Sequence, residues 1–100
     1  MMINEAGLFS AARAGDVEAF EKLIEVYNKK VYSMFLNLCG DKDYANELTQ
    51  EVFVKVYRSI RHLEKESTFP VLVYKTTRDV CLKAFKTRKA FEMVISGKNL

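Results

Sequence analysis

The sequence predicts an all-α protein, a compact bundle of three main helices with a short helix before them. Apolar residues recur at steps of three and four along nearly the whole chain, which is the spacing of one face of an α-helix. Only one proline and four glycines occur among 100 residues, so the composition favours a few long elements over many turns. With 49% hydrophobic residues, the chain can build one core and one domain.

The first two helices are expected on either side of the Gly15-Asp16 pair. A short helix is predicted over residues 4–14, and Gly15 ends it. Asp16 is a favourable N-cap for the second helix, which Gly40 ends. Its stripe of core residues spans more than five turns and consists of Phe20, Leu23, Ile24, Tyr27, Val31, Met34, Phe35 and Leu38.

The third helix begins at an acidic segment, residues 41–43, and ends near residues 61–63. Two faces follow from its helical spacing. The predicted core face carries Ala45, Leu48, Val52, Val56 and Ile60. The opposite face carries Glu47, Gln50, Glu51, Val54 and Arg58.

A polar loop, residues 62–68, leads into the fourth helix. Thr68 is the expected N-cap, and Pro70 falls in the first turn, where its missing N–H costs nothing. The residues expected to face inward are Val73, Thr76, Thr77, Val80, Ala84 and Phe85. We expect one domain over residues 1–90, and residues 91–100 as a tail or the start of a linker. Phe91, Val94 and Ile95 favour a longer helix, whereas Ser96-Gly97 favours a stop.

Several function classes find no support in the sequence. There is no basic start followed by an apolar run and no segment of about 18 apolar residues, so we expect a cytoplasmic protein without membrane insertion. Cys39 and Cys81 lie far apart and His62 is the sole histidine, so reduced, partly buried thiols are expected and no metal site. No phosphate-binding glycine loop and no nucleophile with a base is present, so we expect neither an enzyme nor a cofactor.

The charge is divided along the chain. Residues 1–60 hold seven lysines and arginines against nine carboxylates, a net charge of −2. Residues 61–100 hold nine against four, a net charge of +5. This asymmetry favours a molecule that meets a basic partner with its first half and a polyanion with its second.

Four segments, in order, resemble region 2 of the extracytoplasmic-function (ECF) sigma factors of bacterial RNA polymerase. GDVEAFEKL at 15–23 resembles that family's GD-x-EAFEEL, and Val31-Tyr32 resembles its VYRLA segment. Gly40-Asp41 followed by ANELTQEVF at 45–53 resembles GD…DAEDLTQEVF. Ser67-Thr68-Phe69, Tyr74 and Arg78 match SSF-x-x-WLY-x-x-AR. The likeness covers about residues 11–89.

The resemblance implies that the third helix docks on the clamp helices of the polymerase's largest subunit. Apolar groups would supply affinity, and carboxylates would orient a basic partner. The residues to which we assign this contact are Glu47, Leu48, Gln50, Glu51, Phe53 and Val54. From spacing alone, an ordinary solvated helix face is the favoured interpretation.

The resemblance also implies that the domain recognises and melts the promoter −10 element by capturing a flipped base of its non-template strand in the loop. Leu63, Ser67 and Phe69 are the expected pocket walls, with selectivity from residues 64–66, and Phe69 is alternatively a core residue. Cations of the fourth helix are expected to contact backbone phosphates. The full set assigned to DNA is Leu63, Lys65, Ser67, Phe69, Lys75, Arg78, Lys83, Lys86 and Arg88.

The chain departs from the family pattern mainly where DNA contacts are expected. Pro70 stands in place of an arginine, Leu72 in place of a tryptophan, and Asp79 in place of an asparagine. Tyr44 and Asn46 replace acidic residues. The expected partners are core RNA polymerase, promoter DNA and an anti-sigma factor. An alternative is a free-standing interaction module, a split-sigma subunit or a decoy, because no region 4 is present in the sequence.

Overall fold

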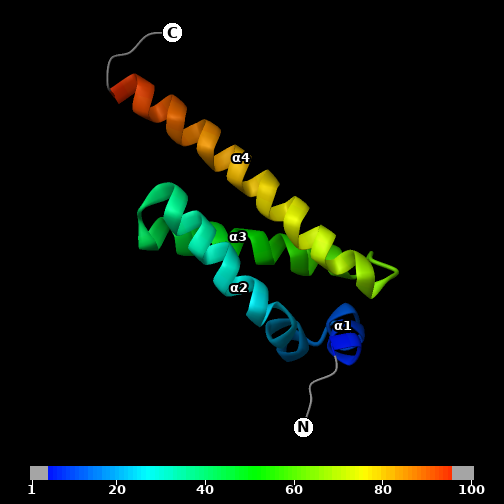
Figure 1. Cartoon of the computed structure of the whole chain (residues 1–100). Helices are drawn as coiled ribbons and strands as arrows, with labels where there is room; N and C mark the ends of the chain where they lie inside the picture. Colours follow the sequence, from blue (N-terminus) through cyan, green and yellow to red (C-terminus); the bar gives the residue numbers. More distant parts are fainter. Residues whose placement is uncertain (1–4, 96–100) are drawn as a thin grey trace.

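The computed structural model describes the backbone of residues 5–95 and the side chains of residues 7–86. Its elements are α1 (Glu5–Arg13), α2 (Val17–Cys39), α3 (Lys42–Ile60), the 3₁₀ turn η1 (Glu66–Thr68) and α4 (Phe69–Ile95). No strand occurs among residues 5–95. The predicted all-α bundle of three main helices and a short N-terminal one is confirmed (Figure 1).

Local capping bonds fix the ends of α2 and α3. The Asp16 carboxylate accepts a hydrogen bond from the backbone N–H of Ala19 at 3.1 Å, which satisfies a donor that has no partner within the helix. Gly40 adopts the left-handed conformation, with φ of 68°, and its N–H donates to the Leu36 carbonyl. The Asp41 carboxylate then accepts from the N–H of Tyr44 at 3.1 Å. The two long helices are therefore joined by a two-residue connection.

The core lies where α3 is enclosed by its neighbours. α2 packs against α1 and α3, and α4 packs mainly against α3; α4 crosses the bundle and runs on past it (Figure 1). The most deeply buried large side chains are Phe35, Val52, Val56, Ile60 and Val80. Two threonines in the core are satisfied locally, because the hydroxyls of Thr49 and Thr77 each donate at 2.7 Å to the carbonyl four residues earlier.

Aromatic contacts tie α1 to the loop between α3 and α4. Phe69 packs edge-to-face against Phe9 of α1, with ring centroids 6.2 Å apart, and against Tyr27 of α2, at 5.6 Å. The Arg13 guanidinium also donates a hydrogen bond of 3.4 Å to the carbonyl of Glu64. The loop and the first residue of α4 are thus held in place by α1 and α2.

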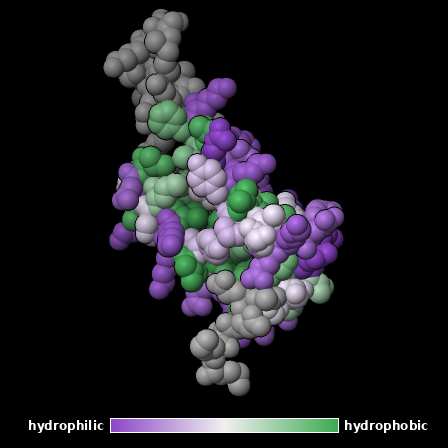
Figure 2. All heavy atoms as spheres, turned by 45° about the vertical axis from the view of Figure 1, so that its right-hand side comes forward, coloured by the Kyte–Doolittle hydropathy of each residue, from purple (hydrophilic) through white to green (hydrophobic). Residues whose placement is uncertain are grey.

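Two residues predicted to face inward are exposed. Leu38, in the last turn of α2, and Phe85 of α4 are each 61% exposed. Both residues line one small pocket where the end of α2 meets α3 and α4, and Phe85 lies at the flank of the α4 stripe, beside the more buried Ala84. Apolar side chains stand among polar ones on the face shown in Figure 2.

The start and end of α4 add detail to the sequence prediction. The helix begins directly after Thr68, but the hydrogen bond shown for its hydroxyl is a donation of 2.6 Å to the Lys65 carbonyl within the 3₁₀ turn. α4 continues through Ile95, so the backbone of 91–95 is helical. Residues 96–100 lie outside the described residues.

Candidate functional site

An exposed ridge runs along α3. Glu47, Gln50, Val54 and Arg58 follow at steps of three and four and are all exposed, with Val54 at 49%. Glu51, beside them, is half-buried, and its carboxylate lies 3.4 Å from the ammonium of Lys55. The ridge therefore presents an apolar side chain flanked by an amide and charged groups.

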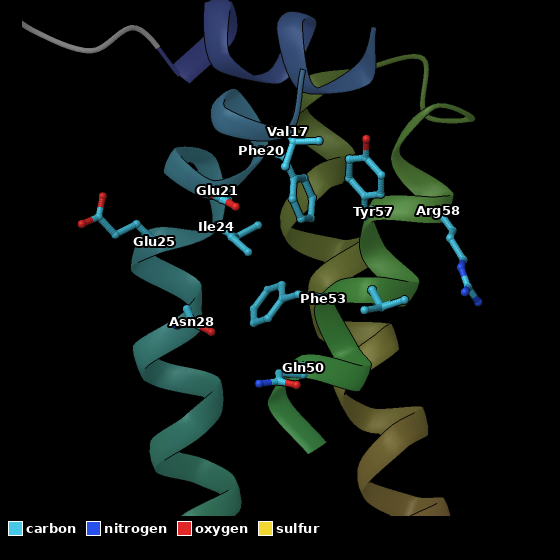
Figure 3. A pocket seen from close by; sticks show the side chains of 11 residues that line it. Val17, Phe20, Glu21, Ile24, Glu25, Asn28, Gln50, Phe53, Tyr57 and Arg58 are labelled. Atoms are coloured by element: carbon cyan, nitrogen blue, oxygen red, sulfur yellow. The ribbon is translucent and has the colours of Figure 1, made fainter. Parts of the chain in front are cut away.

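A groove of about 600 Å³ lies between this ridge and α2. In Figure 3 the side chains of Phe20, Ile24 and Phe53 point into the space between the two helices. Val17 and Val54 also line the groove and are about half exposed. The groove is an apolar trough that is open to solvent and long enough to follow several turns of both helices.

Polar side chains border the groove on both sides. Glu21 and Glu25 line it from α2, while Gln50 and Arg58 line it from α3. Glu25 and Arg58 project away from the trough on opposite sides in Figure 3. The predicted polymerase contact lay on α3 alone and did not include the α2 wall of the groove. An apolar residue in the first turn of α2, Val17, was the available sign of that wall.

A second pocket, which we call the loop pocket, has a volume of about 370 Å³. Its lining combines η1 with the start of α4 and the first half of α2, and consists of Leu23, Tyr27, Glu66, Ser67, Phe69 and Pro70. Of the predicted wall residues, the structure brings Ser67 and Phe69 together here. Leu63 packs against the core instead, and Lys65 is exposed; neither lines the pocket.

The predicted cations of α4 are exposed where the structure describes them. Lys75 and Lys86 are eleven residues apart and lie on nearly one line of the helix, with Arg78 and Lys83 to either side. Lys83 also lines a shallow pocket together with Glu47 and Glu51 of α3. The side chain of Arg88 lies outside the described residues.

Comparison with known proteins identifies a matching family and several similar proteins. The Sigma-70 region 2 family matches residues 23–91. The ECF RNA polymerase sigma factor SigW of Bacillus subtilis is 22% identical over 89 residues, which cover 89% of this chain and 46% of that protein. The ECF RNA polymerase sigma-E factor of Haemophilus influenzae is 30% identical over 73 residues, 73% of this chain and 38% of that protein.

The chain belongs to the sigma-70 region 2 family. The predicted likeness to region 2 of ECF sigma factors is thereby confirmed. The RNA polymerase sigma-H factor of Pseudomonas aeruginosa is 28% identical over 68 residues, 68% of this chain and 35% of that protein. This region 2 chain spans less than half the length of these curated relatives. No solved structure gives a significant match.

In the structure of the region 2 domain, two residues of α3 that were assigned to an exposed docking face are buried. Leu48, 8% exposed, belongs to the core and is absent from the groove, so it does not form part of an exposed docking surface. Phe53 is 6% exposed and is likewise a core residue, although its ring lines the groove. Leu48 belongs to the predicted core face, so its burial agrees with that prediction, whereas the burial of Phe53 was not predicted. The docking role of both residues stays a prediction.

Phe69 is the third residue that the region 2 fold places in the core. It is 2% exposed and packs against Phe9 and Tyr27, so the alternative that Phe69 is a core residue is correct. Phe69 also lines the loop pocket.

Cys39 and Cys81 are half-buried free thiols.

Two general features complete the description of the region 2 domain. Within the described part of the chain, no three metal-ligating side chains gather at one place. None of the described helices combines the length and apolar character that a membrane span requires.

Proposed function

We propose that this region 2 domain serves transcription initiation, docking on core RNA polymerase with one face and capturing the opened non-template strand of a promoter −10 element with another. The observation that carries the proposal is the open apolar groove beside the exposed ridge of α3. This ridge belongs to the segment 45–53 that resembles the docking string of ECF sigma factors. The partner on this face is the clamp-helix pair of the largest polymerase subunit, and the location is the cytoplasm.

The polymerase contact follows from what the groove leaves exposed. Val17 and Val54 are about half exposed, and covering them with a partner helix removes apolar surface from water. Glu21 and Glu25 line this surface from α2, and Glu47 lies on the ridge beyond Gln50; these carboxylates attract and orient a basic partner. A helix laid into a groove, with its apolar face inward, is a common mode of recognition.

The strand contact rests on the loop pocket. Its volume of about 370 Å³ lies within the usual range for small-molecule sites, about 300–1,000 Å³. Tyr27 and Pro70 offer faces against which an unstacked base can pack, and Glu66 and Ser67 offer hydrogen-bonding groups. The exposed Lys75, Arg78 and Lys86 provide phosphate contacts along α4.

The energetics make the two contacts depend on each other. Stacking on protein contributes about 1–3 kcal/mol per captured base. Unstacking and unpairing that base costs a few kcal/mol. Because these quantities are similar, the domain alone does not open duplex DNA, and the polymerase contact supplies the difference by holding it at the promoter.

The polymerase contact is tested by capturing core RNA polymerase on the immobilised domain. Val54→Asp places a charge in the groove, and we expect at least about a ten-fold loss of capture, as for a central interface residue. The matched control is Val26→Asp, since Val26 is an exposed valine of α2 (61%) that does not line the groove. Equal capture by both variants would contradict docking through the groove.

A further inference from the structure

A smaller pocket, of about 270 Å³, lies where the turn between α1 and α2 meets the C-terminal end of α3. Its lining consists of Ala12, Arg13, Ala14, Gly15, Tyr57, Ile60 and Arg61. The charged side chains among these residues are two arginines, and no carboxylate side chain is among them. The Tyr57 hydroxyl is engaged as a donor to the Gly15 carbonyl, at 3.5 Å. We call this the arginine pocket.

Two arginines at one pocket favour an oxyanion. The planar fork of N–H donors matches the oxygens of a phosphate better than an ammonium does. Each of these arginines also lies at the C-terminal end of a helix, where a cation interacts favourably with the helix dipole. That role accounts for one cation at each helix end but not for two of them lining the same pocket.

The arginine pocket and the loop pocket are joined by one short segment of chain. Arg61 begins that segment, and Arg13 donates to the carbonyl of Glu64 within it. Glu66, two residues later, lines the loop pocket. On the other side, Phe9 lies one helical turn before Arg13 and packs on Phe69, which also lines the loop pocket. Residues 61–66 therefore connect the two pockets and offer a path for the backbone of a strand with a base in the loop pocket.

We infer that Arg13 and Arg61 hold a backbone phosphate of the single strand whose base enters the loop pocket. The inference rests on the proposed strand capture and adds a phosphodiester site on the side of the loop away from α4. Contacts to phosphate set the position and direction of a strand but do not read its sequence. The site therefore fixes how the base approaches Glu66 and does not select which base enters.

The test measures binding of the whole chain to fluorescent single-stranded oligonucleotides across a range of salt concentrations. Each phosphate contact to a single strand contributes about −0.7 to the slope of log K against log salt concentration. The double variant Arg13→Gln/Arg61→Gln should therefore have a slope that is less steep by about 0.7. The affinity of the double variant for the oligonucleotides should fall by the same factor whichever base stands at the captured position. Lys29→Gln removes a charge on α2 that lines neither pocket and should change the affinity much less.

Two further measurements separate a phosphate site for DNA from an effect on helix stability and from a site for free anions. Arg61→Lys keeps the charge at the end of α3, so a loss of binding in this variant points to the guanidinium fork and not to helix stability. Inorganic phosphate is added as a second ligand. If the double variant loses thermal protection by phosphate but binds oligonucleotides normally, the pocket is a free-anion site and the assignment to DNA is overturned.

The failure of this inference is distinguishable from the failure of strand capture. An unaltered salt slope and affinity in the double variant, with the unaltered chain still binding single strands, would overturn the phosphate site alone. No binding of single strands by the unaltered chain, even with core polymerase present, would remove strand capture and the phosphate site together.

Discussion

At the scale of single residues, Glu66 is the side chain best placed to select a captured base. It is half-buried and lines the loop pocket beside Ser67. A carboxylate accepts hydrogen bonds, so it suits cytosine and adenine, which present an exocyclic amine. Thymine and guanine present a carbonyl oxygen at the corresponding position and are disfavoured.

Glu66→Gln should therefore weaken the preference for amine-bearing bases, because an amide both donates and accepts. We expect about a five- to 150-fold loss of discrimination, since a good side-chain pair with a base contributes roughly 1–3 kcal/mol. The measurement compares four oligonucleotides that differ at one base. Glu64→Gln is the control, because Glu64 lies in the same loop but does not line the pocket. An unchanged preference in Glu66→Gln would rule out this role.

At the scale of elements, the sequence predicts helix ends well because the signals are local. Asp16, Gly40 and Asp41 act within four residues of themselves, and each makes the bond that its position predicts. Exposure is harder to predict because it depends on neighbours. Phe53 was assigned to an exposed docking face, yet the packing of α2 and α4 around α3 encloses it, as it encloses Leu48.

The cap of α3 gives a prediction about stability. Asp41→Ala removes the acceptor for the Tyr44 N–H and should cost about 0.5–2 kcal/mol of unfolding free energy. For a domain of this size, each kcal/mol lowers Tm by about 4–8 °C. Asp43→Ala is the control, because it removes a first-turn carboxylate for which the structure shows no capping bond. Thermal unfolding followed by circular dichroism checks the difference, and equal losses in the two variants would contradict the capping role.

The functional surfaces were only partly predictable from the sequence, because they, like burial, depend on which helices become neighbours. The resemblance located the α3 segment and the loop, and the structure brings Ser67 and Phe69 to one pocket. The groove could be recognised only from the fold, because Val17 and Glu21 come 29 to 41 residues before the α3 residues that line it with them. The arginine pocket likewise joins Arg13 and Arg61, which no local pattern connects.

At the scale of the whole molecule, the excess of positive charge lies on α4, because α2 and α3 each carry three carboxylates and three cations. Glu21 and Glu25 line the groove from α2, and Arg58 lines it from α3. The cations Lys75, Arg78 and Lys86 lie on α4, which crosses the bundle (Figure 1). The proposed polymerase contact thus lies between carboxylates of α2 and a cation of α3, whereas the proposed DNA contact uses the cations of α4.

Promoter opening in the presence of both partners tests this account most directly. A promoter fragment with 2-aminopurine in the −10 non-template strand is mixed with core RNA polymerase and the domain. We expect a rise in fluorescence when the labelled base unstacks, and no rise with either protein alone or with the Val54→Asp domain. Fluorescence with both proteins that stays at the level of core polymerase alone would contradict the proposal that this domain opens the −10 element.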